Sequence, residues 1–294
     1  MYIAGAGRSG STLVDTLLGA GPGRFSGGEL TNVARAASAG EVCSCGSVAL
    51  ECPFWGSILR RALHDSGYAN FHEANSAVRT LERSRRWMAF GRGNLEDSAR
   101  WSVYADFTRG VLRGVVAKSG CETIIDSSNV PIRAGLLSKV LGVDRVTVIH
   151  LVRDARGFAE SRARSFRPDP TQGIERSIKG KSKVNSAGVW CFRNAECEWL
   201  ARVLPRNSVV RVRFEDVLQG PRALPLALRP EGMTWSIGSS VPGPPHMLAG
   251  NRLRMQDTIR IRVASESPPR STPLALVPAL PLMIRYEYLL RRSQ

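Results

Sequence analysis

The stretch that most constrains this chain is its first glycine-rich segment, which reads IAGAGRSGST over residues 3–12. The apolar residues before it are typical of the end of a short strand, and Ser11–Gly19 places apolar side chains at helical spacing. A glycine-rich turn from a strand into a helix lets backbone N–H groups converge on an anion at the helix N-terminus. We therefore expect this loop to bind a phosphate group.

Further along, apolar strands alternate with helices. The pattern predicts strands at 121–126, 145–152 and 209–214, and helices at 55–65, 73–90, 101–118, 130–142, 154–165 and 187–204. Such alternation is typical of a parallel sheet covered on both faces. We predict an α/β fold with a P-loop-like central parallel β-sheet, flanked by helices on both faces, in a single domain spanning 1–294. Gly-, Pro- and Ser-rich segments at 230–245 and 265–273 are too short to indicate a boundary.

The charge of the chain favours an anionic partner. Its formal net charge is +16, and only five of its 41 basic residues are lysines. Arginine suits bidentate contacts to phosphate and sulfate. The basic stretch 164–183 lacks the interleaved aromatics of a single-strand binding platform, and no helix-turn-helix or zinc-finger signature occurs, so we expect no nucleic acid partner.

The N-terminus and the hydropathy pattern bear on location. Residues 1–7 lack the charged start and apolar stretch of a signal peptide, and no run approaches 18 uninterrupted apolar residues. We expect a cytoplasmic protein without a membrane span.

The first loop differs from that of nucleotide hydrolases. Gly5 and Gly10 fit the pattern GxxxxGK[ST], but Ser11 stands where the lysine belongs. Arg8, earlier in the loop, partly replaces the missing cation. A P-loop kinase or NTPase remains an alternative because CETIID ends in Asp126 as a magnesium-binding segment does, and it predicts magnesium-dependent ATP binding.

A second motif narrows the choice. The stretch HLVRDARGFAESR places Arg153 at a strand end and Ser161 eight residues later in a helix. Together with GRSGSTL, these residues resemble the sulfotransferases that use 3′-phosphoadenosine 5′-phosphosulfate (PAPS), of bacterial type and related to the tyrosylprotein and carbohydrate branch. The segments IIDSSNVPIRAGLL, VRFEDVLQGP and HMLAGNRLRM follow in the order of that family, so the resemblance extends from Ile3 to about Tyr288.

The resemblance implies a binding site for PAPS, whose spent form is 3′,5′-adenosine bisphosphate (PAP), without a metal. A loop at 5–13 would hold the 5′-phosphosulfate, segment 151–162 the 3′-phosphate, and a late loop at about 246–256 would cover the nucleotide. The implied cofactor-binding residues are Gly7, Arg8, Ser9, Gly10, Ser11, Thr12, Leu13, Arg153, Ser161, Asn251 and Arg254. Arg8 would also stabilise charge on the leaving phosphate.

The same resemblance points to Glu29 in FSGGELTN as the base that takes the proton of the acceptor. The alternative interpretation is that Glu29 is a helix-capping or surface glutamate. His246 is a second candidate base. His150, within an apolar strand, is expected in the core, and Asp15 is expected to face solvent by helical periodicity.

One position departs from the family. Relatives carry lysine where DSSN ends in Asn129, so Arg252 or Arg254 would have to compensate. A catalytically weakened nucleotide-binding protein or basic anion-binding protein is therefore a further alternative. The acceptor stays open among carbohydrates, lipids, peptide tyrosines and small natural products.

Three cysteines lie close together in CSCGSVALEC, at Cys43, Cys45 and Cys52. With a fourth ligand from elsewhere they could bind zinc, but their spacing matches no standard zinc motif. We expect a structural loop there and no metal.

Overall fold

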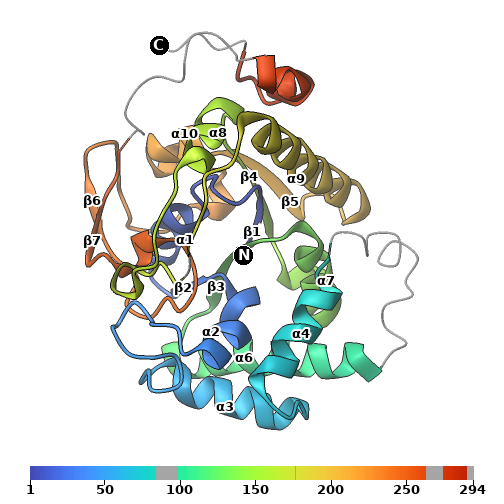
Figure 1. Cartoon of the computed structure of the whole chain (residues 1–294), viewed down its shortest axis with the longest axis vertical. Coiled ribbons are helices and arrows are strands. Elements are labelled where there is room, and N and C mark those ends of the chain that lie inside the picture. Colours follow the sequence, from blue (N-terminus) through green and yellow to red (C-terminus); the bar gives the residue numbers. More distant parts are fainter. Residues whose placement is uncertain (84–98, 176, 263–273, 290–294) are drawn as a thin grey trace.

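The computed structural model describes residues 1–83, 99–175, 177–262 and 274–289. Its centre is a five-stranded sheet in the order β2-β3-β1-β4-β5 (Figure 1). All four pairings are parallel. The strands are β1 (Tyr2–Gly5), β2 (Arg24–Gly28), β3 (Thr123–Asn129), β4 (Val148–Val152) and β5 (Val209–Arg213). The prediction of an α/β fold with a parallel central sheet is confirmed.

Both faces of the sheet are covered, because successive buried side chains of β1 pack into clusters on opposite faces. Ile3 packs with α1 (Ser11–Gly19) and with the segments after β5. Tyr2 and Ala4 point the other way, into a cluster shared with α7 (Pro131–Leu141) and α9 (Lys183–Val203). Because successive side chains of a strand face opposite sides, a strand buried on both faces needs apolar residues throughout.

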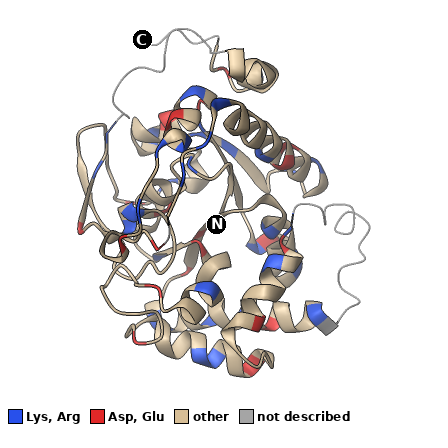
Figure 2. Ribbon diagram, viewed as in Figure 1, with Lys and Arg blue, Asp and Glu red and all other residues tan. Residues whose placement is uncertain are grey.

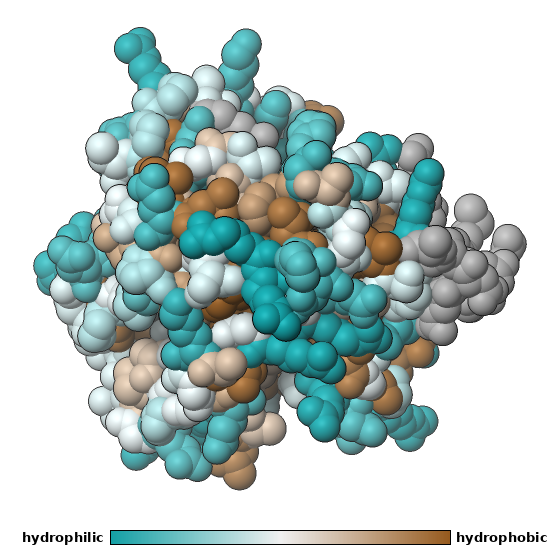
Figure 3. Space-filling view, turned by 90° about the horizontal axis from the view of Figure 1, so that it is seen from below, coloured by the Kyte–Doolittle hydropathy of each residue, from teal (hydrophilic) through white to brown (hydrophobic). Residues whose placement is uncertain are grey.

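A helical layer forms a second core beside the strand β2. It contains α2 (Val33–Ala39), α3 (Trp55–Ser66), α4 (Phe71–Leu81) and α6 (Ala99–Ser119). Phe25 of β2 stacks on Phe54 with ring centroids 4.8 Å apart, and Trp55 is fully buried beside them. Figure 3 views the molecule from the side of α3 and shows hydrophilic side chains over much of that face.

Further elements complete the fold. They are α8 (Ala155–Ala163), α10 (Phe214–Leu218), the hairpin of β6 (Ser240–Pro242) and β7 (Thr258–Arg260), α11 (Leu280–Arg285) and the 3₁₀ turns η1 (Leu30–Asn32), η3 (Val143–Arg145), η4 (Pro170–Gln172), η5 (Pro221–Ala223), η6 (Leu226–Leu228), η7 (Arg252–Met255) and η8 (Leu274–Ala279). In the described part of the chain, no helix combines the length and apolar character that crossing a membrane requires.

Most of the predicted elements are present, but several differ, and α2, β6 and β7 were not predicted. The helix predicted over 73–90 ends at Leu81, and residues 84–90 lie outside the described part of the chain. The Gly-, Pro- and Ser-rich segment 265–273 also lies outside it. The strand β2 was not predicted, because its RFSGG sequence holds two glycines. The short helix α10, directly after β5, was also missed.

Candidate active site

The first loop turns sharply between β1 and α1, and its two outer glycines are required by close approaches. A Cβ on Gly5 would lie 2.5 Å from the carbonyl oxygen of Leu151, and one on Gly10 would lie 2.1 Å from the ring of Phe214. Gly10 also has a φ of +90°, in the left-handed region that favours glycine. Neither position admits a larger residue without displacing its neighbour.

The loop leaves hydrogen-bond donors available at the start of α1. The first described backbone bond of the helix runs from the N–H of Val14 to the carbonyl of Gly10, and no side chain caps the helix. The amides of residues 11–13 therefore have no intrahelical acceptor. Ser9 is buried, and its hydroxyl has no hydrogen-bond partner within the described residues. Donors of this kind at a helix N-terminus can bind an anion.

Arg153 joins this loop from the end of β4. Its Nη1 donates to the carbonyl oxygen of Arg8 at 3.1 Å, and its guanidinium lies over the ring of Phe214 at 5.2 Å. The indole N–H of Trp190 donates to the Arg153 carbonyl at 2.9 Å. Two motifs 145 residues apart in the sequence are thus in contact. Ser161 lies two turns into α8 and is half-buried.

Further arginines, on α8 and on the late segment (residues 246–256), interact electrostatically with Arg8 of the loop. Figure 2 marks the Lys and Arg positions along the ribbon in blue. The guanidinium groups of Arg8 and Arg252 lie 5.4 Å and 5.1 Å from the ring centroid of Phe166. Burial lowers the pKa of Arg8, and the charges of Arg162 and Arg252 lower it further. Arg162 donates through Nη2 to Asn185 at 2.9 Å, while its buried Nε has no partner among the described residues. An anion placed here would relieve this repulsion.

The late segment lies against the start of α1. The N–H of Asn251 donates to Thr12 Oγ1 at 3.2 Å, which brings the segment into contact with the start of α1, directly after the glycine-rich loop. Arg254, in contrast, is buried and bonded to other parts of the chain. It donates to the carbonyls of Gly173 and Val42 at 3.1 Å and 3.0 Å and pairs with a carboxylate 3.2 Å away on the segment before α9. Of the two late arginines, Arg252 is the exposed one.

Glu29 follows β2, and its backbone is fixed by the same late segment. Its N–H donates to the Ala249 carbonyl at 2.8 Å, and its side chain accepts a 2.6 Å bond from Asn32 Nδ2. Burial raises the pKa of Glu29, although the Asn32 amide and the charge of Arg35 oppose the shift. The side chain makes no capping bond to η1.

Asp15 is buried, so the prediction that it faces solvent was wrong. Its Oδ2 accepts from the N–H of Gly28 at 2.9 Å and from the Ser127 hydroxyl at 2.6 Å. Burial raises its pKa to about 8. Periodicity failed because α1 lies between the sheet and the late segment, so that every residue from Ser11 to Leu18 is buried.

The two histidines occupy different environments. His150 is in the core of β4 as expected, bonded to Asn194 Oδ1 at 2.9 Å, and burial lowers its pKa to about 4. His246 stacks on Phe54 with centroids 5.2 Å apart, and its Nδ1 lies 3.6 Å from Cys52 Sγ. His246 therefore contacts the cysteine-containing loop and the residues that follow it.

Asn129 lies at the end of β3, paired in register with Ala4 of β1. Its φ is +64°, and its amide donates to the Ser127 carbonyl at 2.7 Å. Asparagine adopts the left-handed region more readily than lysine does, because its short side chain bonds to the local backbone. The backbone here thus gives asparagine a conformational advantage.

Asp126 is engaged in a buried network that the sequence did not reveal. Its Oδ1 accepts from the N–H of Ser128 at 3.0 Å, and its Oδ2 accepts from Arg133 Nε at 3.0 Å. Arg133 also donates to Glu82 at 2.5 Å, which accepts from Tyr104 at 2.9 Å. The carboxylate of Asp126 is therefore neutralised by an internal cation. Arg133 and Glu82 carry no motif, and only the fold pairs them.

Comparison with known proteins adds two likenesses. The sequence matches no family model and no curated protein. A sulfotransferase domain from the Synechococcus PCC 7002 olefin synthase is similar over 99% of this chain and 94% of its own, with 20% identity and a TM-score of 0.47. A sulfotransferase domain from the curacin biosynthetic pathway is similar over 97% and 96%, with 14% identity and a TM-score of 0.46. Likeness at this level does not establish a shared family.

Proposed function

We propose that this protein is a sulfotransferase that moves a sulfuryl group from PAPS to a hydroxyl or amine of an acceptor. The observation that carries the proposal is the gathering of Arg8, Arg153, Arg162 and Arg252 around a glycine-rich loop at a helix N-terminus. The donor carries roughly three to four negative charges, since a phosphomonoester alone contributes about 1.5 to 2. So many cations near one loop suit a ligand with more than one anionic group.

In this proposal the anionic groups are divided between two parts of the site. The amides of 11–13 and the unpartnered hydroxyl of Ser9 hold the 5′-phosphosulfate at the start of α1. Arg153, together with Ser161, takes the 3′-phosphate beside the phosphate loop. The late segment, held by the bond from Asn251 to Thr12, closes over the nucleotide.

The reaction is an in-line displacement, in which positioning and charge stabilisation supply most of the acceleration. The acceptor oxygen or nitrogen forms a bond to sulfur as the bond from sulfur to the phosphate oxygen breaks, and PAP leaves. Arg8 stabilises the charge that grows on that phosphate oxygen. Glu29 takes the acceptor's proton, and its raised pKa favours this role. The sulfuryl group carries less charge than a phosphoryl group, so these arginines can serve without a metal.

A kinase or NTPase is less well supported by the same residues. Magnesium-dependent chemistry needs a free carboxylate after a neighbouring strand, whereas Asp126 is paired with the buried Arg133. The loop also has Ser11 in place of lysine. A basic protein that binds the nucleotide and turns it over slowly remains the second candidate, because Asn129 supplies no charge to the transferring group.

Transfer is tested by incubating the chain with PAPS and one acceptor from each class: a phenol, a carbohydrate, a lipid alcohol and an amine. Release of PAP is followed by chromatography, with Glu29→Gln as the comparison. We expect acceptor-dependent PAP release by the wild-type chain that Glu29→Gln loses. Binding of PAP, with no acceptor-dependent release of PAP from PAPS in any class, would favour the second candidate instead.

We propose that the enzyme acts in the cytoplasm on an acceptor that the variable surface loops select.

A further inference from the structure

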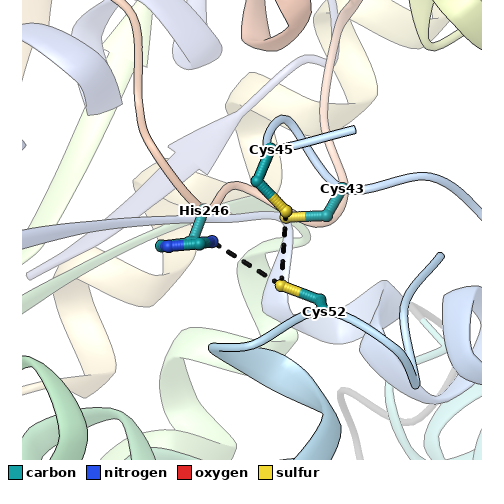
Figure 4. Close-up of side chains that lie close together, drawn as sticks. All are labelled: Cys43, Cys45, Cys52 and His246. Carbon is teal, nitrogen blue, oxygen red and sulfur yellow. Dashed lines mark hydrogen bonds between the residues drawn. The ribbon is translucent and has the colours of Figure 1, made fainter. Parts of the chain in front are cut away.

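A second cluster of reactive side chains lies beside the proposed active site, and the proposed function does not use it. Cys43, Cys45 and Cys52 come together with His246, which lies about two hundred residues later in the chain (Figure 4). Each offers one ligand atom, and the four atoms all lie within 4.8 Å of one another. In Figure 4 the three sulfurs and the imidazole point toward a common centre.

The spacing of these atoms fits a tetrahedral zinc ion. Zinc binds sulfur at about 2.3 Å and histidine nitrogen at about 2.0 Å, so tetrahedral angles separate two sulfurs by about 3.8 Å and sulfur from nitrogen by about 3.5 Å. The Sγ atoms of Cys45 and Cys52 are 3.5 Å apart, and Cys52 Sγ is 3.6 Å from His246 Nδ1. These two pairs, of the six in the set, are already near the distances that a bound ion would impose.

The backbone presents the thiols in a tight turn. The N–H of Cys43 donates to the Ser47 carbonyl and the N–H of Gly46 donates back to the Cys43 carbonyl, both at 2.9 Å. Gly46 has a φ of +86°, which glycine adopts without strain. Cys52 Sγ accepts from the N–H of Trp55 at 3.5 Å, an interaction that a thiolate strengthens.

The histidine is held in position from two sides. The Trp55 indole N–H donates to the His246 carbonyl at 2.6 Å, and Phe54 stacks on the imidazole. Ser44, between the first two cysteines, donates through its hydroxyl to the Pro244 carbonyl and accepts from the Met247 N–H, both at 2.8 Å. The two segments are therefore joined on either side of the four ligand atoms.

Two cations donate to backbone carbonyls beside the cluster. Three thiolates and a neutral imidazole around a divalent ion leave a net charge of −1. Arg254 donates to the carbonyl of Val42, next to Cys43, and Lys118 donates to the carbonyl of Pro53, next to Cys52. Both cations offset that charge at close range.

We propose that Cys43, Cys45, Cys52 and His246 bind one structural zinc ion. Four protein ligands close the coordination sphere, which is the arrangement of structural rather than catalytic zinc. The ion ties the loop 43–52 to the late segment, whose Ala249 carbonyl accepts from the N–H of Glu29. It thereby stabilises the segment that covers the phosphate loop, and it removes His246 from the candidate bases.

A disulfide between Cys45 and Cys52 is the rival account of the same contacts. Forming it would shorten the 3.5 Å separation of their sulfurs to about 2.0 Å and would leave Cys43 and His246 without a role. The two accounts differ in metal content and in the oxidation state of the thiols, so both can be measured on one preparation.

The test is zinc analysis of the full chain, purified without chelator from zinc-supplemented cells. We expect about one zinc per chain, and a fall to background in Cys45→Ser and in His246→Asn. Because Cys45 is exposed, its replacement by serine leaves the core packing unchanged. Cys191→Ser, outside the cluster, is the matched control and should keep its zinc. Replacing zinc by Co²⁺ should give the visible absorption of tetrahedral thiolate coordination.

Two outcomes would overturn the proposal. One is a wild-type chain with no more zinc than Cys45→Ser; the other is peptide mapping that finds Cys45 linked to Cys52. Zinc content is measured without the nucleotide, so this result stands apart from the proposed sulfotransferase function. A zinc-containing chain that fails to bind PAP would refute that function and leave the metal site in place.

Discussion

Arg153 donates a 3.1 Å hydrogen bond to the carbonyl oxygen of Arg8, which ties the end of β4 to the loop after β1. The bond uses only one of the five N–H groups of the guanidinium, and the others remain able to contact a phosphate. Since parallel strands end at one edge of the sheet, the two motifs lie side by side there.

Arg153→Ala should weaken PAP binding by about 10- to 100-fold, because a hydrogen bond to a charged group contributes about 1.5 to 3 kcal/mol. The matched control is Arg206→Ala, an exposed arginine before the amino end of β5 and thus at the opposite edge of the sheet. Calorimetric titration measures both. Equal affinities of the two variants would contradict the role of Arg153.

Glu29→Gln should leave PAP affinity unchanged and lower turnover by about 10²- to 10⁴-fold, the usual contribution of a general base. Burial raises the pKa of Glu29, so the acid limb of the wild-type rate profile should lie above the ordinary carboxyl range. Activity should fall as the pH drops through that pKa and Glu29 is protonated. A parallel loss of affinity and turnover would indicate a structural role instead.

Asp15 should make the stability of the protein depend on pH. Its pKa is raised from 3.8 to about 8, so the folded state binds a proton that the unfolded state releases. The free energy of unfolding should therefore decrease as the pH rises from about 4 to about 8, with a slope of at most roughly 1.4 kcal/mol per pH unit.

Urea titrations at a series of pH values measure this slope. Asp15→Asn should reduce it, since the amide resembles the protonated carboxyl and does not titrate. Asp144→Asn, at an exposed position, is the control and should keep the wild-type slope. An unchanged slope in Asp15→Asn would show that other groups cause the pH dependence.

Asn129→Lys should raise turnover if the missing cation limits the reaction, and it should cost about 1 kcal/mol of stability because φ is +64°. Asn207→Lys, at a φ of +71° on an exposed turn before β5, carries the same backbone cost without reaching the site. Rate assays and thermal unfolding separate the two effects. A variant that loses stability without gaining turnover would show that charge at this position is not limiting.

The sequence predicted the loop, Arg153 and the approach of the late segment because each lies in a motif with its own local pattern. It could not place Asp15, since periodicity gives one buried face and α1 is covered all round. Pairings such as that of Arg133 with Glu82 join side chains 51 residues apart and leave no local signal.

The cysteine cluster shows the same limit. Three ligands lie within ten residues, but the fourth is 194 residues from Cys52, so the spacing matches no zinc motif and the sequence favoured a loop without metal. Only the fold, which brings the late segment beside β2, completes the set. Local patterns were therefore sufficient for the strands β1, β3, β4 and β5 and for the glycine-rich loop, and insufficient wherever a contact depends on tertiary packing.

Calorimetric titration of the wild-type chain with PAP in magnesium-free buffer, beside ATP with magnesium, distinguishes a sulfotransferase site from a kinase or NTPase site. We expect tight, magnesium-independent binding of PAP and little binding of ATP, because the site is built from arginines and its nearby carboxylate, Asp126, is already paired with Arg133. Preference for ATP with magnesium, or binding of neither nucleotide, would contradict it.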